Sequence, residues 1–167
     1  QRNVDLGRIS LEEKNKLLDN FIGVTQLEKI ADRELIIEAV FEEMDVKKEI
    51  FTKLNKICPS DTILASNTSY LDINEIAKVI NNPERMLGMH FFSPANIMKL
   101  LEIIVGEKTS AETVATAFSL GKKMKKIPVR SGVCDGFIGN RILSKYLVAT
   151  YHMIEDGASI YDIDRVI

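Results

Sequence analysis

Two apolar stretches of the chain each contain one titratable side chain. Residues 88–94 are GMHFFSP and residues 99–105 are KLLEIIV, so His90 and Glu102 interrupt runs that predict buried strands. Side chains alternate between the two faces of a strand, and both faces of 100–105 are otherwise apolar, which predicts that Glu102 is buried. A buried carboxylate without a partner is costly, so Glu102 requires one.

His90 is the partner that the sequence offers, because the only other histidine, His152, falls in a late helical stretch. If the two strands are neighbours, the imidazole and the carboxylate meet. A carboxylate bonded to one ring nitrogen fixes the tautomer and raises the basicity of the other nitrogen, which makes a general base. A purely structural His–Glu pair at the end of a sheet fits the same pattern, and the residues alone leave both interpretations open.

Two further polar groups stand beside predicted elements. The segment 66–69, SNTS, follows a predicted strand at its carboxyl end, where ligands of open α/β sheets bind, but it also suits a turn that caps the next helix. Asn140 lies one turn into a predicted helix, on a stripe with Phe137, Ser144 and Tyr151. Its amide is either a polar group of the core whose hydrogen bonds are satisfied within the protein, or a group that points at a ligand.

Strands and helices alternate along the chain. We predict strands at 22–25, 35–40, 62–65, 86–90, 100–105 and 127–130, and helices at 11–20, 44–57, 73–80, 111–126 and 136–154 and from 160 onward. This alternation is typical of an α/β protein with a parallel, doubly wound sheet. The composition changes near 132–136, after which the chain is all helical, so we predict domains at 1–132 and 133–167.

No phosphate-binding loop accompanies the predicted sheet. None of the nine glycines forms a GxG pair, so neither GxGxxG nor a Walker A loop is present. Either the chain never bound a nucleotide, or its first strand–loop–helix unit is missing. The last predicted helix is still continuing at Ile167, which favours a fragment cut at both ends.

Composition narrows the class of protein. The chain has 167 residues, 46% hydrophobic and 28% charged, with a net charge of -2, which argues against a nucleic-acid binder. No run approaches the ~18 apolar residues that span a bilayer, and the polar N-terminus lacks the core of a signal peptide. Cys58 and Cys134 form no CxxC motif, which predicts reduced thiols, no metal site and a cytoplasmic location.

Three motifs together resemble one family. ASNTS (65–69), GMHFFSPANIMKLLEII (88–104) and SGVCDGFIGNR (131–141) are similar to the L-3-hydroxyacyl-CoA dehydrogenases, above all to the dehydrogenase part of bifunctional β-oxidation enzymes that also carry an enoyl-CoA hydratase. The resemblance covers nearly the whole chain in the right order. It implies a partial Rossmann-like NAD-binding domain without its first strand–loop–helix unit, then the start of an all-helical C-terminal domain.

The resemblance also implies roles for four catalytic residues. His90 matches the family's general base, and Glu102 matches the acid that orients and polarises it. Ser69 matches a residue that bonds the substrate and lies beside the nicotinamide. Asn140 matches the amide that holds the substrate at the reacting centre. For the His90–Glu102 pair, the segment 66–69 and Asn140, the residues alone allowed both a structural and a functional interpretation. The resemblance favours the functional one.

For the cofactor, the resemblance implies contacts from Glu42, Lys47, Ser69 and Ser93. Ser93 is a departure, since many members have an asparagine there; serine still forms hydrogen bonds, and HFFSP is similar to the bifunctional branch. The implied reaction is the reversible oxidation of (S)-3-hydroxyacyl-CoA to 3-ketoacyl-CoA with NAD, in fatty-acid β-oxidation or butanoate metabolism.

The resemblance further implies a homo-oligomer, a dimer in the intact protein, without nucleic-acid or membrane partners. Because the phosphate loop is absent, we expect the 167-residue chain alone to bind NAD poorly and to be inactive. Two alternatives are a non-catalytic relative of the same fold and a dehydrogenase of a free hydroxy acid.

Overall fold

The computed structural model describes residues 2–167, which divide into two compact units, one ending at Ala31 and the other running from Asp32 to Ile167. The first unit contains α1 (Arg2–Asp5), α2 (Leu11–Asp19) and a 3₁₀ turn, η1 (Leu27–Ile30). Ser10 Oγ accepts a hydrogen bond from Glu13 N at 3.0 Å, and Glu13 Oε2 accepts one from Ser10 N at 2.8 Å. This capping box starts the helix that the sequence predicted at residue 11.

The strand predicted at 22–25 is wrong, because these residues belong to no strand. Phe21 and Ile22 are 81% and 80% exposed and Val24 is 39% exposed, so little of this apolar stretch is buried. A strand forms where a neighbouring strand satisfies its backbone groups, and four apolar-leaning residues do not supply that partner.

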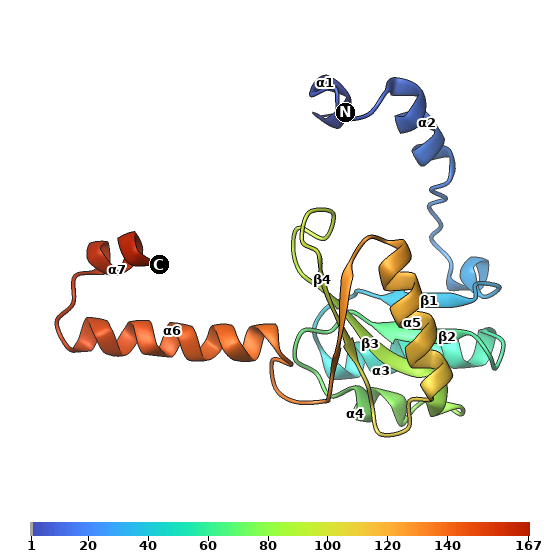
Figure 1. Ribbon diagram of the computed structural model, residues 1–167. Helices are drawn as coiled ribbons and strands as arrows, with labels where there is room; N and C mark the ends of the chain where they lie inside the picture. Colours follow the sequence, from blue (N-terminus) through green and yellow to red (C-terminus); the bar gives the residue numbers. More distant parts are fainter. Residues whose placement is uncertain (1) are drawn as a thin grey trace. The chain divides into compact units, whose positions relative to one another are not determined.

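The second unit is built on a five-stranded sheet, shown in Figure 1. Its strands lie in the order of the chain: β1 (Leu35–Glu38), β2 (Ile63–Ser66), β3 (Met86–Phe91), β4 (Leu100–Ile104) and β5 (Ile127–Ser131). The connections contain α3 (Met44–Ile57), α4 (Ile73–Ala77), η2 (Pro83–Arg85) and α5 (Ala111–Lys123). The α/β class predicted from the sequence is therefore confirmed, although α4 ends at Ala77 and not near Ile80.

The sheet is not wholly parallel, which corrects the sequence prediction. Strands β1, β2 and β3 pair in parallel, β3 and β4 pair antiparallel, and β4 and β5 pair in parallel. Residues 92–99 connect β3 to β4. A parallel crossover needs about a dozen residues or more, so this short connection requires an antiparallel return.

The two faces of the sheet differ in polarity. One face carries a buried cluster of Ala65, Leu87, Met89, Leu101 and Ile103, onto which α5 packs through Ala117. In Figure 1, α5 lies across the strands. Because side chains alternate along a strand, the opposite face carries the polar side chains of Glu38, Ser66, His90 and Glu102.

Two helices follow the sheet: α6 (Gly139–Glu155) and α7 (Ile160–Val166). The helix predicted at 136–154 corresponds to α6, and its predicted start at residue 136 is wrong. Gly136 and Phe137 have φ values of +68° and +50°, which no helix contains, and the N-cap is Ile138. Phe137 therefore does not share a helical stripe with Asn140.

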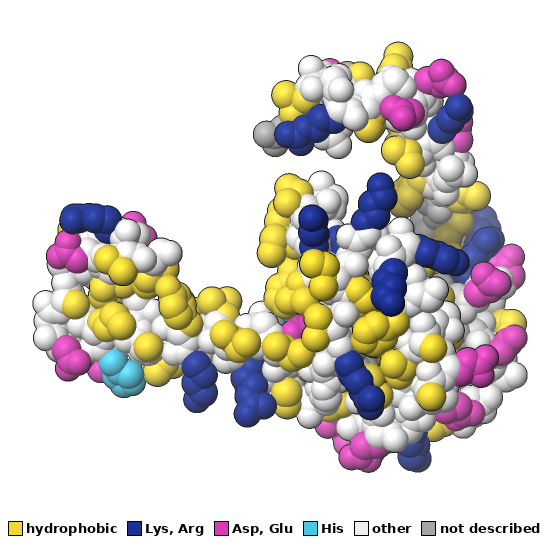
Figure 2. Space-filling view, viewed as in Figure 1, with side chains coloured by type: hydrophobic (Ala, Val, Ile, Leu, Met, Phe, Trp, Pro, Cys, Tyr) yellow, Lys and Arg dark blue, Asp and Glu magenta, His cyan; other side chains and the backbone are white. Residues whose placement is uncertain are grey.

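Hydrophobic side chains gather along α6, as Figure 2 shows. Ile142, Leu143 and Tyr151 are among its exposed apolar residues. Between residues 2 and 167, no helix is both long enough and apolar enough to cross a membrane.

Candidate active site

His90 and Glu102 stand directly opposite each other on β3 and β4. His90 Nδ1 and Glu102 Oε2 are 2.6 Å apart, and the two residues are 4% and 0% exposed. The antiparallel pairing produces this contact, because directly opposed residues of antiparallel strands hold their side chains side by side on one face. The structure thus brings together the pair that the sequence singled out.

The second carboxylate oxygen of Glu102 is held by the start of α6. Oε1 accepts hydrogen bonds from Ile138 N at 3.0 Å and from Gly139 N at 2.7 Å. These N–H groups precede the first helical hydrogen bonds, and the positive end of the helix dipole favours a negative charge beside them. Glu102 is therefore a buried acceptor surrounded by donors, so His90 Nδ1 carries a proton toward it.

Nε2 is then the basic nitrogen of the neutral His90 ring. In the part of the chain that the structure describes, no hydrogen-bond partner contacts Nε2. The Phe92 ring lies 4.6 Å from the imidazole, centroid to centroid, and the Phe137 ring lies at 5.8 Å. Two aromatic rings thus flank a base whose tautomer is fixed by its acid.

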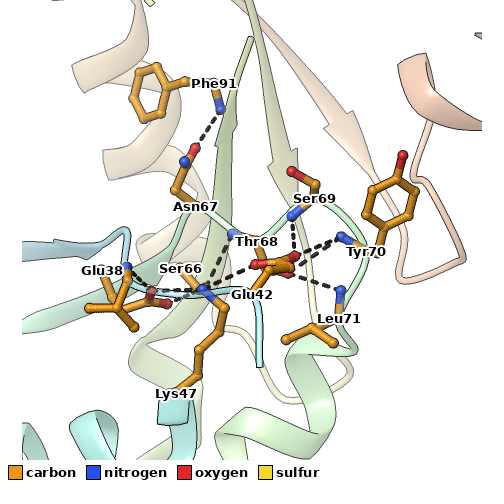
Figure 3. A network of polar contacts seen from close by, with 11 residues as sticks. Glu38, Glu42, Lys47, Ser66, Asn67, Thr68, Ser69, Tyr70, Leu71 and Phe91 are labelled. Carbon is orange, nitrogen blue, oxygen red and sulfur yellow. Dashed lines mark hydrogen bonds and ion pairs between the residues drawn. The ribbon is translucent and has the colours of Figure 1, made fainter. Parts of the chain in front are cut away.

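The SNTS loop is fastened to the strands on both sides of it. Ser66 Oγ donates a hydrogen bond to Glu38 Oε2 on β1 at 2.6 Å. Asn67 Oδ1 accepts one from Phe91 N on β3 at 2.8 Å, as Figure 3 shows. The loop is therefore anchored to the end of the strand that carries His90.

Glu42 organises the rest of this loop. Thr68 Oγ1 donates to Glu42 Oε1, and so do the backbone N–H groups of Ser69 at 2.7 Å and Tyr70 at 3.2 Å. The Ser69 hydroxyl has no hydrogen bond to any described residue, and Figure 3 shows it on the side away from Glu42. Three of the four SNTS side chains fix the loop, and Ser69 keeps its hydroxyl available for a ligand.

Lys47 lies beneath the loop and joins two carboxylates. Its Nζ is 2.7 Å from Glu38 Oε1 and 3.2 Å from Glu42 Oε2, and the side chain is 1% exposed. Burial acts to raise the pKa of Glu42, but hydrogen bonds from Thr68 and Ser69 and the nearby Lys47 charge outweigh it, so this pKa lies below its ordinary value. Any effect of Lys47 on a cofactor is therefore transmitted through the half-exposed Glu42.

The remaining predicted site residues lie in exposed or partly exposed positions. Ser93 is exposed, at the start of the connection between β3 and β4. Lys126 Nζ fastens this connection by donating to the carbonyl groups of Ala95 and, at 2.7 Å, Met98. Asn140 is the second residue of α6 and lines a pocket together with Tyr70, the residue after Ser69.

Sequence reasoning missed Glu38, Lys126 and the amides at the start of α6. Glu38 showed the signal that identified Glu102, an acidic residue at the end of the apolar run LIIE. The N–H groups of Ile138 and Gly139 carry no such signal, because every residue except proline has one.

The fold and the site together define a class of protein: a Rossmann-like α/β domain with a carboxylate-oriented imidazole on its sheet and a hydroxyl-bearing loop at the carboxyl end of a strand. The particular family follows from direct comparison. Residues 1–134 match the family model "3-hydroxyacyl-CoA dehydrogenase, NAD binding domain", and residues 136–167 match "3-hydroxyacyl-CoA dehydrogenase, C-terminal domain". The chain belongs to the 3-hydroxyacyl-CoA dehydrogenase family.

Similar proteins carry related names. The peroxisomal bifunctional enzyme of Danio rerio is 48% identical over 141 residues, which are 84% of this chain and 20% of that protein. A peroxisomal fatty acid beta-oxidation multifunctional protein of Arabidopsis thaliana is 42% identical over 167 residues, 100% of this chain and 23% of that protein. The chain thus spans about a fifth of the length of the curated relatives it matches.

Solved structures agree with this assignment. The (S)-3-hydroxybutyryl-CoA dehydrogenase of Ralstonia eutropha superposes with a TM-score of 0.94 at 32% identity, covering 97% of this chain and 58% of that one. The 3-hydroxybutyryl-CoA dehydrogenase of Escherichia coli gives a TM-score of 0.91 at 38% identity, covering 95% of this chain and 34% of that one.

Proposed function

We propose that this chain forms the core of an NAD-dependent dehydrogenase that reversibly oxidises (S)-3-hydroxyacyl-CoA to 3-ketoacyl-CoA. The observation that carries the proposal is the buried pair of His90 and Glu102, whose 2.6 Å contact leaves Nε2 as the base. The names of the relatives, a fatty acid beta-oxidation multifunctional protein and two 3-hydroxybutyryl-CoA dehydrogenases, support the substrate class.

The residues around the loop suit a nicotinamide. A carboxamide needs both acceptors and donors, and Glu42, Ser69 and Ser93 offer a half-exposed carboxylate, an unpaired hydroxyl and an exposed hydroxyl. We assign these three side chains to cofactor binding, and Lys47 to holding Glu42 in place. When bound, NAD supplies the acceptor for the hydride that leaves the substrate.

The chain's own residues handle the proton. His90 Nε2 removes the proton of the 3-hydroxyl as the C3–H bond breaks and the C=O bond forms, and the ring becomes an imidazolium. Glu102 stabilises that cation, and Ile138 and Gly139 hold Glu102. Ser69 and Asn140 are assigned to holding the substrate, since fixing the reacting groups in one geometry supplies much of the rate.

The test replaces His90 with glutamine in the full-length protein. We expect acetoacetyl-CoA reduction, followed by NADH absorbance, to slow about 100-fold or more, in line with the ~10²–10⁴ of general acid–base catalysis. His152→Gln is the matched control, because this histidine is an exposed residue of α6 that contacts only Glu155 in the described chain. Near-normal turnover of His90→Gln removes His90 from the mechanism.

The same assay separates the alternatives. A dehydrogenase of a free hydroxy acid oxidises 3-hydroxybutyrate as well as 3-hydroxybutyryl-CoA, and a non-catalytic relative oxidises neither. The unpaired Ser69 hydroxyl lies on a loop that is anchored to the strand of the oriented base, which favours a catalytic protein, since a purely structural His–Glu pair requires no such hydroxyl.

We further propose two domains, 1–132 and 133–167, and a homo-oligomer. The two family models, which match 1–134 and 136–167, support the first proposal. The exposed apolar side chains of α6 support the second. The cytoplasmic location stays a prediction, since the names of the relatives with 43–48% identity place those proteins in peroxisomes.

A further inference from the structure

The turn that leads into α6 has an unusual backbone. Gly136 and Phe137 both have positive φ values, +68° and +50°, and Phe137 is 1% exposed. A bulky residue in the left-handed region is uncommon, and such residues persist where the surrounding structure enforces them, often at functional sites. Here the turn delivers two successive N–H groups, from Ile138 and Gly139, to one oxygen of Glu102.

Gly139 has no room for a side chain. A Cβ atom there would lie 2.6 Å from Phe92 Cζ and 2.9 Å from Phe92 Cε1, closer than real Cβ atoms come to other atoms. It would also lie 3.6 Å from Glu102 Oε1. A side chain at residue 139 would therefore force the Phe92 ring, which packs on His90, or the start of α6 to shift.

We propose that Gly139 is a positioning residue for the base, and that the start of α6 sets the orientation of His90 through Glu102. The chain of contacts runs from the N–H groups of Ile138 and Gly139 to Oε1, through the carboxylate, and from Oε2 to His90 Nδ1. The inference rests on the proposed function for its catalytic measurement.

This arrangement couples two parts of the family's architecture. His90 and Glu102 lie in the residues that match the NAD-binding domain, and Gly139 lies in those that match the C-terminal domain. If the start of α6 withdraws from β4, Oε1 loses both of its backbone donors, and the carboxylate is no longer held toward the imidazole. His90 is therefore oriented as a base only when the start of α6 is packed against the sheet.

The first experiment compares Gly139→Ala with Gly132→Ala in the full-length protein. A Cβ at Gly132 meets nothing within 4 Å, and its φ is not positive, so this variant is the matched control. For Gly139→Ala we expect kcat to fall at least 10-fold while the KM values for NAD and the acyl-CoA change less than threefold. Gly132→Ala retains the kcat of the unmodified protein.

A double-mutant cycle shows whether Gly139 acts through Glu102. In a Glu102→Ala background, Gly139→Ala has no carboxylate left to misplace, so its effect on kcat falls below twofold. An equal loss in both backgrounds means that the methyl group acts by packing alone, which overturns the proposal. A kcat of Gly139→Ala equal to that of Gly132→Ala also overturns it.

A second variant removes the N–H donor without adding a Cβ atom, and otherwise weakens only the Ile138 carbonyl that accepts from Ile142 N. Glycolic acid in place of Gly139, introduced by nonsense suppression, exchanges the N–H for an ester oxygen and adds no Cβ. The N–H of the first helical residue takes no part in helical hydrogen bonds, so α6 still forms. Loss of a hydrogen bond to a charged group predicts a fall in kcat of about 10-fold or more, and an unchanged kcat overturns the proposal. An inactive unmodified protein would instead overturn the proposed function.

Discussion

Glu102→Gln replaces one carboxylate oxygen with an NH₂ group and leaves the shape of the side chain unchanged. The start of α6 fixes the orientation of the introduced amide. The N–H groups of Ile138 and Gly139 require an acceptor, so the amide oxygen occupies the Oε1 position. The NH₂ group therefore faces His90 Nδ1, which must become an acceptor. The ring proton moves to Nε2, and the base loses the lone pair that takes the substrate proton.

The cost of restoring the active tautomer follows from the same contacts. Turning the amide round leaves two part-buried N–H groups, which now lie 3.0 and 2.7 Å from Oε1, without an acceptor. Each unsatisfied buried donor costs about 1–3 kcal/mol, so the flip costs roughly 2–6 kcal/mol. At about 1.4 kcal/mol per factor of ten, kcat should fall by roughly 30-fold to 10⁴-fold. The analogous carboxylate-to-amide change in a serine-protease triad costs about 10⁴.

The assay is acetoacetyl-CoA reduction by the full-length protein, with Glu107→Gln as control because Glu107 is an exposed residue just after β4. Circular dichroism and the unfolding midpoint check that the fold is retained. Nitrogen-15 NMR of labelled histidine then reports the tautomer, which we expect to change from Nδ1–H to Nε2–H at His90. If the variant keeps more than a third of the kcat, or keeps the Nδ1–H tautomer, the proposed role of Glu102 in fixing the tautomer is wrong.

Two further predictions concern the network of Lys47. Lys47→Met should lower the free energy of unfolding by about 3–5 kcal/mol, because Glu38 would stay buried without its cation. The control Lys48→Met breaks a 3.5 Å surface pair with Glu75 and should lower it by less than about 1 kcal/mol. Urea titration measures both losses, and equal losses would contradict the prediction. The pKa of Glu42 is lowered on folding, so its charge adds stability above about pH 4.5 that is lost as the pH falls through the lowered value. The urea midpoint of the unmodified protein should therefore fall more steeply in acid than that of Glu42→Gln, and parallel pH profiles would contradict it.

Local periodicity was enough to place most of the elements. The apolar run at residue 35 and the helical spacing from Met44 to Ile57 each gave an element that the structure contains. The burial of Glu102 followed from strand alternation, and the need of a buried charge for a partner led to His90. These inferences succeeded because each depends on neighbours in the sequence or on a rule about burial.

The sequence reasoning failed at several places, and the physical reason differed from one to the next. The run at 22–25 was predicted as a strand, but no other described strand pairs with it and Ile22 is 80% exposed. The helix expected from Gly136 starts instead at Gly139, because Gly136 and Phe137 adopt left-handed conformations. Residues 92–99 were too short for a parallel crossover, a signal that was present but was not used.

The class of fold, the pair of titratable side chains and the SNTS loop could be identified from residue types and their spacing, because these are local properties. The way in which the pair is held depends on the three-dimensional arrangement of the strands and of α6. Strand β4 had to run antiparallel to β3 before Glu102 could face His90, and α6 had to begin at Gly139 before two backbone N–H groups could fix the carboxylate. Backbone donors are the same in every residue except proline, so their placement is decided by the fold and not by the letters of the sequence.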